Sequence, residues 1–450
     1  MLAKAGSFVK SVSVAVPVAQ SVTGLGFRPK ALILWCSNGF VSGTFDLRNR
    51  FSLGISDGTT SYSIATEDID AAATMATAQA MSATALQIIV PDAVVASCDL
   101  ASFDNDGFTL SWTVNEAFGE IVNYLALGGS ELSAKVVLHT MKTTSTGTLG
   151  VTGVGFVPDF AMHIWHGTPD TLPHVGAWGT NNCFGFGAMD GTSQWAVGVN
   201  AQDGVLTSDT ARTQKTSAAI YQMHSGGTTL GVAAFSSWDA DGFTLNWSSV
   251  DSADSVASLC LKGGDYVVGN FAKSVDAAPV TNTITGLGSN ASAVLLASYM
   301  AAADATVRVN HLNLGLGASD GTSNVCLATT SEDGQANADC SNVTVTNKAF
   351  VKVNNYSDTI EAQCTVARAA DGAIVTWDTN DAVAMETLFA AFGPFTSGGG
   401  GTGGGGGRGR GGGGGNGGGN GGNGPGPGGP PGKNQTDVFV GGRRRPTAAW

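Results

Sequence analysis

Three observations predict an all-β fold, with three tandem antiparallel β-sandwich (jelly-roll-like) domains followed by a glycine-rich low-complexity tail. Four short motifs recur in the same order, apolar residues alternate with polar ones, and Asp-Gly pairs separate the alternating runs. Alternation with a period of two is typical of half-buried strands. Asp-Gly pairs tolerate the positive φ of tight hairpin turns. Many short strands with frequent turns favour a sandwich.

The recurring motifs define the domains. One of them begins at Asp106, Asp241 and Asp371, and separations of 135 and 130 residues suit a whole domain rather than a solenoid repeat. The third copy is the most divergent. The other motifs start at Thr23, Thr152 and Thr285, at Ser56, Met189 and Ser319, and at Tyr124, Leu259 and Leu388. We therefore expect β-sandwich domains at residues 1–131, 132–265 and 266–396.

Local patterns assign several strands within these copies. In the first copy Phe108, Leu110 and Trp112 alternate with polar residues, so we expect them to face the core, as do the corresponding Trp247 and Trp377. Residues 71–85 are rich in Ala, Thr and Met, which also suits a helix. Their counterpart in the second copy, residues 207–216, is polar. We therefore predict a loop or a short helical turn there, followed by a strand over 86–90.

The end of the chain differs in composition and charge. Residues 398–432 contain 25 Gly in 35 positions, which cannot form a packed core, so residues 397–432 are interpreted as a spacer. Residues 398–450 carry a net charge of +5, against −13 for the whole chain, so residues 1–397 carry −18. An acidic body repels phosphate, and nucleic acid is therefore not an expected partner for it. The absence of any apolar run of 18 residues predicts no membrane insertion.

Several motifs resemble catalytic or metal-binding sites, but a structural interpretation is favoured for each of them. Ser56 and Ser319 match a G-x-S-x-G pattern, but Met189 replaces the serine in the second copy, and the setting is strand-turn-strand. His163, His166 and His174 recur in no other copy, and residues three apart on a strand face opposite sides. The Asp104 and Asp239 segments resemble the start of a calcium loop, but a hairpin turn is favoured. We expect no cofactor, no metal and no enzymatic activity.

The cysteines and the aromatic residues suggest two further roles. Seven cysteines, an odd number without C-x-x-C spacing, are interpreted as small buried apolar residues of a protein folded in a reducing cytosol. A sugar ring stacks on exposed indole. Because Trp178 and Trp195 lie beside His174 and glycine-rich turns, we take these three residues as a possible glycan platform.

The basic C-terminal peptide, residues 433–450, is a possible anchor. Alternating apolar residues, an arginine triplet and an aromatic end suit addition as a strand to a partner's sheet edge. An unfolded end without a partner, and glycine runs packed as polyproline-II-like strands, remain alternatives. The candidate partner-binding residues are Val438, Phe439, Val440, Arg443, Arg444, Arg445 and Trp450.

Three of these motifs resemble a domain of tailed-bacteriophage virion structural proteins. They are V-T-G-x-G-F-x-P (22–29 and 151–158), D-x-D-G-F-T-L-x-W (104–112 and 239–247) and Y-L-A-L-G-G (124–129). The first two copies match well and the third loosely, since Ser289 and Ala373 replace phenylalanines. The resemblance implies a non-enzymatic capsid decoration, fibre or tail protein, and it transfers no catalytic residues.

The sequence therefore predicts a virion protein made in the host cytoplasm, which contacts other virion proteins within a symmetric assembly. Three fused copies can mimic closed threefold symmetry as a pseudotrimer. The alternative is a receptor-binding adhesin that recognises host-surface glycans. An enzyme acting on polysaccharide ranks third, because no paired carboxylates recur at an interpretable spacing.

Overall fold

The computed structural model describes residues 1–37, 39–90, 93–169, 181–224, 228–250, 252–302, 309–354 and 357–394. These residues form strands β1 to β32 and no helix, and every pair of neighbouring strands is antiparallel. The prediction of an all-β fold is confirmed. None of the described residues belongs to a helix that is long and apolar enough to cross a bilayer.

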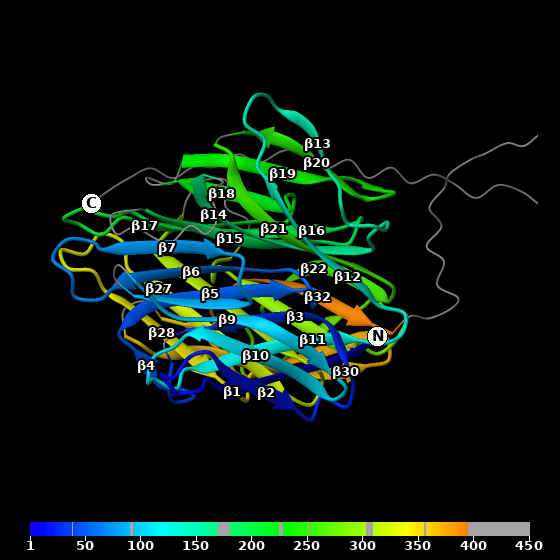
Figure 1. Cartoon of the computed structure of the whole chain (residues 1–450). Helices are drawn as coiled ribbons and strands as arrows, with labels where there is room; N and C mark the ends of the chain where they lie inside the picture. Colours follow the sequence, from blue (N-terminus) through cyan, green and yellow to red (C-terminus); the bar gives the residue numbers. More distant parts are fainter. Residues whose placement is uncertain are drawn as a thin grey trace, which may run out of the picture. The chain divides into compact units, whose positions relative to one another are not determined.

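The first copy contains a large sheet of six strands and a small sheet of four (Figure 1). In the large sheet the order is β1 (Leu2–Val9), β11 (Ile121–Gly128), β3 (Pro29–Cys36), β5 (Arg48–Ser56), β6 (Ser61–Ile69) and β7 (Thr77–Ser82). In the small sheet it is β2 (Val18–Thr23), β10 (Gly107–Val114), β9 (Ala93–Asp104) and β8 (Leu86–Val90).

The second copy repeats this order. Its large sheet runs β12 (Ser133–Thr140), β21 (Asp254–Lys262), β14 (Phe160–Pro169), β15 (Asn182–Met189), β16 (Gln194–Ala201) and β17 (Thr210–Lys215). Its small sheet runs β13 (Gly147–Val151), β20 (Gly242–Ser249), β19 (Thr228–Asp239) and β18 (Ile220–His224).

The third copy has the same arrangement. Its large sheet runs β22 (Asp265–Ala272), β32 (Glu386–Gly393), β24 (Ala293–Ser298), β26 (Leu312–Ser319), β27 (Asn324–Ser331) and β28 (Cys340–Val345). Its small sheet runs β23 (Val280–Ile284), β31 (Gly372–Thr379), β30 (Ile360–Ala369) and β29 (Phe350–Val353).

Two short strands cross between copies. β4 (Phe45–Asp46) of the first copy pairs with β28 of the third, and β25 (Val309–Asn310) of the third pairs with β17 of the second. Both lie between corresponding strands, β3 and β5 in one case and β24 and β26 in the other. Each therefore extends the edge of a neighbouring large sheet, and the described residues, which end at 394, belong to one compact unit.

The hydrophobic cores follow the repeat. Trp112, Trp247 and Trp377 are each buried between the two sheets of their own copy, on the matching strands β10, β20 and β31, as predicted. A further core lies between the three large sheets, with Phe51, Phe184 and Leu314 at matching positions. Burial of apolar area at about 25 cal/mol per Å² makes this shared core a main source of stability.

The prediction for residues 71–85 is wrong for its second half. Thr77–Ser82 form β7, all six residues are buried, and the matching polar segment of the second copy contains strand β17. Because β7 lies against the second copy, both of its faces are covered: the Cys183 N–H donates to Gln79 Oε1 (3.0 Å). A strand covered on both faces shows no alternation. The strand at 86–90 is present as β8.

Candidate functional site: the joints between the three copies

The repeated Asp-Gly-Thr turn carries the first contact between copies. Each aspartate follows the strand β5, β15 or β26, and its Oδ1 atom accepts hydrogen bonds from the turn itself, as when Asp57 accepts the Thr59 and Thr60 N–H groups (2.8 and 2.7 Å). This is the Asx-turn geometry that aspartate favours. The Oδ2 atom remains available to a partner outside the turn.

That partner is the first strand of the next copy. Asp57 Oδ2 accepts the Val136 N–H (2.8 Å) and Asp190 Oδ2 accepts the Val268 N–H (2.8 Å). Asp320 Oδ2 then accepts the Ala5 N–H (3.3 Å), so the third copy returns to the first. We call these three aspartates the turn ring. Their contacts close a cycle, which is what a threefold arrangement requires.

The electrostatics of the turn ring suit its structural role. Burial alone would raise the pKa of Asp57, but hydrogen bonds from Val136, Thr59 and Thr60 outweigh it and lower that pKa below its usual value. Lys135 forms an ion pair with Asp57 (3.5 Å), and Lys4 forms the equivalent pair with Asp320 (3.0 Å). The Asp57 carboxylate is thus held ionised at the first joint.

A second ring of aspartates was not predicted. Asp203 Oδ1 accepts the Thr77 N–H (2.9 Å), Asp333 Oδ1 accepts the Thr210 N–H (3.0 Å), and Asp70 Oδ1 accepts the Cys340 N–H (3.0 Å). We call Asp70, Asp203 and Asp333 the loop ring, since each follows the strand β6, β16 or β27. The cycle again closes, now at the opposite end of those strands.

Backbone hydrogen bonds reinforce the loop ring at every joint. Gly204 N donates to Met75 O (2.8 Å), and Met75 N donates to Val205 O (2.9 Å). The same pair of bonds recurs at the other two joints, through Gly334, Ser208 and Gln335 and through Ala71, Ala338 and Ala72. Position 71 has φ 56°, where the other copies have glycine at φ 72° and 80°. One left-handed turn is therefore kept in all three copies.

A buried carboxyl group lies where the three copies meet. Asp68 accepts hydrogen bonds from Asn49 Nδ2 (2.6 Å) and Asn182 Nδ2 (3.1 Å), and Cys340 Sγ donates to its backbone oxygen (3.3 Å). Burial raises the pKa of Asp68 to about 7 despite both amide donors. Buried polar contacts of this kind can fix which copies pair, because a mispaired polar group would remain unsatisfied.

The turn motifs of the sequence serve structural roles. The Asp104 carboxylate accepts the Ser102 and Thr109 hydroxyls (both 2.7 Å) at the β9–β10 hairpin. Asp106 accepts the Gly24 and Gly26 N–H groups (3.0 and 2.6 Å), which joins two of the recurring motifs. Corresponding contacts recur at Asp241 and Asp371. Ser56 lies at the β5–β6 turn, a strand-turn-strand setting.

His163, His166 and the cysteines are buried, and His139 is half-buried. His163 Nδ1 and His139 Nε2 each form a hydrogen bond with Ser258 Oγ (2.7 and 2.9 Å). Burial lowers the pKa of His163 to about 3 and that of His139 to about 4, so both rings are neutral. Within the described residues no group of three His, Cys, Asp or Glu side chains is placed to hold a metal ion. All seven cysteines are free and buried, as predicted.

The predicted glycan platform does not form around Trp195. That side chain is fully buried in the core between the large sheets, and its Nε1 donates to Phe389 O (2.8 Å) in the third copy. The prediction of Trp195 as an exposed platform is therefore wrong, because the joint between copies covers the ring. Trp178 and His174 lie outside the described residues, as do Val438, Phe439, Val440, Arg443, Arg444, Arg445 and Trp450.

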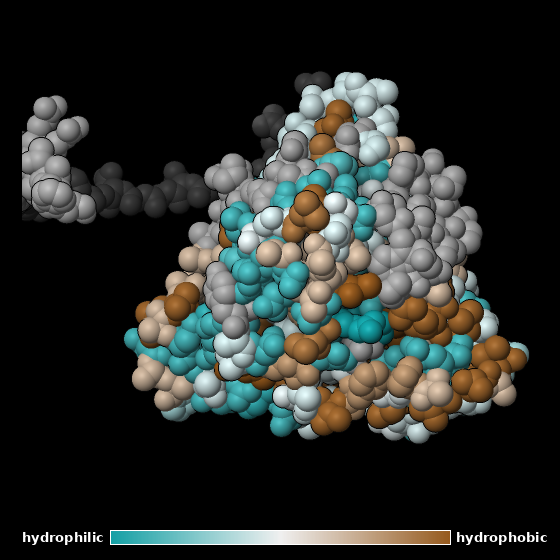
Figure 2. Space-filling view, turned by 90° about the vertical axis from the view of Figure 1, so that its left-hand side faces the viewer, coloured by the Kyte–Doolittle hydropathy of each residue, from teal (hydrophilic) through white to brown (hydrophobic). Residues whose placement is uncertain are grey.

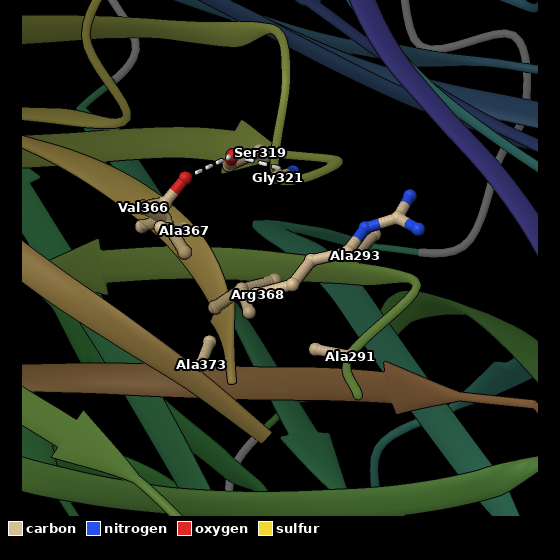
Figure 3. Close-up of a pocket in the computed structure, with 9 residues that line it drawn as sticks. Ala291, Ala293, Ser319, Gly321, Val366, Ala367, Arg368 and Ala373 are labelled. Carbon is tan, nitrogen blue, oxygen red and sulfur yellow. Dashed lines mark hydrogen bonds between the residues drawn. The ribbon is translucent and has the colours of Figure 1, made fainter. Parts of the chain in front are cut away.

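The surface beside each turn ring aspartate differs from copy to copy. In the third copy the Arg368 side chain extends between Ala291 and Gly321 (Figure 3), and its Nε donates to Asp320 O (3.0 Å). The space there is too small for a water molecule. In the first copy Phe103 occupies the position of Arg368, and a hollow of about 490 Å³ lies open beside Gly58.

Exposed apolar side chains gather on the first copy. They belong to three segments, 9–16, 40–47 and 114–118, and Phe40 and Phe118 pack together at 5.8 Å between ring centroids. Figure 2, which turns the side with β4 and β7 toward the viewer, shows apolar residues (brown) gathered at the lower right. We call the exposed apolar residues of the three segments the apolar patch: Val9, Val12, Val14, Val16, Phe40, Val41, Leu47, Val114 and Phe118.

Comparison with known proteins gives no match to this chain, whether with family models, with curated proteins or with solved structures.

Proposed function

We propose that the protein is a non-enzymatic structural component of a tailed-bacteriophage virion, made in the host cytoplasm and carried on the particle. The observation that carries this proposal is the pair of aspartate rings, which lets a single chain present threefold pseudosymmetry. A fused trimer suits a threefold position in a symmetric assembly. The motifs that begin at Val22 and Asp104 resemble those of tailed-bacteriophage virion proteins, and they support the same class of protein.

The polar groups at the joints support a structural role. In both rings the aspartates accept backbone N–H groups of a neighbouring copy, so their chemistry is used in holding the copies together. The apolar patch supports a protein partner, because contiguous exposed apolar surface is typical of interaction sites. We propose other virion proteins as that partner, with the basic C-terminal peptide as the anchor.

Two measurements on particles test this proposal. Native mass measurement and labelled imaging should place one chain at each threefold position, and three chains there would contradict the pseudotrimer. Truncation after Ser397 should abolish association with the particle, while Phe118→Asp should weaken it. Val383→Asp is the matched control, since Val383 is exposed at the corresponding place in the third copy. Undiminished association of the truncated chain would remove the anchor role.

A further inference from the structure

An open groove lies where the first copy meets the start of the second. Two hollows of about 490 and 450 Å³ adjoin there, and both are lined by Arg28, Pro29 and Lys30. Phe103 and Ala134 line one hollow, and Phe27 and Ser130 line the other. The groove therefore has room for a small polar ligand, with one phenylalanine in the lining of each hollow.

The groove does not follow from closure of the turn ring, because two of the side chains that line it, Arg28 and Phe103, are replaced in both other copies. Val157 in the second copy and Asn290 in the third occupy the position of Arg28. In the third copy, Arg368 fills the space beside Gly321 that corresponds to the hollow beside Gly58. The turn ring closes through the turn aspartate and the first strand of the next copy, and all three joints keep this contact. Arg28, Lys30 and Phe103 are therefore specific to the first joint, whereas Phe27 and Pro29 recur as Phe156 and Pro158 in the second copy.

Arg28 is the cation available to a ligand. Arg28 is exposed, and its side chain makes no hydrogen bond or ion pair with the described residues. Lys30, in contrast, already donates to Ser130 O (3.1 Å) and Leu132 O (2.7 Å). Arg28 interacts electrostatically with the nearby Asp104 carboxylate, and its guanidinium keeps a planar pair of donors that matches a ligand carboxylate.

The other groups of the groove suit a sugar ring. Phe103 is half-buried against Gly58, where a Cβ atom would lie 2.8 Å from the ring, so the position of the ring is fixed. Thr59 and Ser102 also line this hollow, and each hydroxyl oxygen can accept a hydrogen bond from a sugar hydroxyl group.

We propose that this groove binds a saccharide that carries a carboxylate, such as a uronic acid. The carboxylate pairs with Arg28, the sugar ring packs on Phe103, and the Ser102 hydroxyl accepts a hydrogen bond from the sugar. The inference goes beyond the proposed structural function and does not depend on it. It also places saccharide recognition at a joint between copies, away from Trp195.

Saturation-transfer NMR and calorimetry on the full-length protein test the proposal with three probes: a glucuronate-containing disaccharide, the neutral glucose disaccharide and acetate. We expect the uronate disaccharide to bind at least 10-fold more tightly than the other two. Arg28→Ala and Phe103→Leu should each weaken its binding at least 10-fold. Asn290→Ala, at the position of Arg28 in the third copy, is the matched control and should leave binding unchanged.

The melting temperature of each variant separates loss of the site from loss of the fold. Arg28→Ala removes no hydrogen bond or ion pair among the described residues, and its interaction with the exposed Asp104 carboxylate is screened by solvent, so its melting temperature should stay close to that of the parent. The proposal is overturned if the uronate disaccharide does not bind, if it binds Arg28→Ala as tightly as the parent, or if the neutral disaccharide or acetate binds equally well.

Discussion

We predict that Asp190→Asn weakens the joint between the second and third copies and leaves the turn intact. Asp190 Oδ1 accepts the Thr192 and Ser193 N–H groups (2.8 and 2.7 Å), and the asparagine oxygen can keep both bonds. The amide nitrogen then replaces Oδ2 and faces the Val268 N–H, so two donors meet. Val268 is 2% exposed, and water has little access to its backbone.

The expected cost follows from the contact that is lost. A hydrogen bond to a charged acceptor contributes about 1.5–3 kcal/mol, and an unsatisfied buried donor costs about 1–3 kcal/mol, so we expect a loss of about 2–4 kcal/mol. For a cooperative unit of this size the unfolding entropy is about 0.8 kcal/mol per kelvin. The melting temperature should therefore fall by about 2–5 °C.

Calorimetry and urea denaturation measure the global loss, and hydrogen exchange of the Val268 amide measures the local one. Asp99→Asn is the control, because Asp99 is exposed. The amide of Val268 should exchange faster in Asp190→Asn only. A loss within 0.5 kcal/mol of the control, or faster exchange confined to the turn at 190–193, would refute the role of the turn ring.

Three further outcomes follow from backbone geometry and burial. Ala71→Gly should stabilise the protein by about 0.5–1 kcal/mol in urea denaturation, because φ 56° strains an L-residue, and a loss would contradict this. His163 has a folded pKa of about 3, below the unfolded value of about 6.5. The unfolded chain therefore takes up the proton first, so stability should fall as pH drops from about 6.5 toward 3, and His163→Asn should flatten this slope. Gly191→Ala should cost about 1–3 kcal/mol more than Gly153→Ala in the same denaturation assay. Both residues have φ near 90°, but only at Gly191 would a Cβ meet a neighbour, 2.3 Å from Trp238 Nε1; equal losses would contradict the steric cause.

The structural features that could be predicted from the sequence are those whose causes lie within a single copy. Alternation placed Trp112 in its core, and the Asp-Gly pairs marked hairpins, because both signals depend on neighbours along the chain or across one sheet. The second bond of Asp57 was not predictable in this way, since its partner Val136 belongs to another copy. For the same reason Trp195 was misassigned to the surface.

The loop ring left a partial signal in the sequence. Asp-Gly pairs occur at Asp203 and Asp333, and they align with Asp70, but alanine follows Asp70 and hides the repeat. The left-handed φ of Ala71 shows that the backbone turn persists without its usual glycine. An alignment of the copies by spacing rather than by residue identity would have found all three aspartates.

A comparison of the three joints distinguishes residues that close the turn ring, which are identical in all copies, from neighbouring residues that differ between copies. Asp57, Asp190 and Asp320 are identical because each must accept a backbone N–H in the same geometry. Beside them, Phe103 and Arg368 occupy one structural position with different chemistry, and only the first leaves an open groove. In a trimer of identical chains, any change at this position would appear at all three joints. Fusion of the copies removes that constraint, so one joint can acquire a ligand site while the other two keep the ring closed.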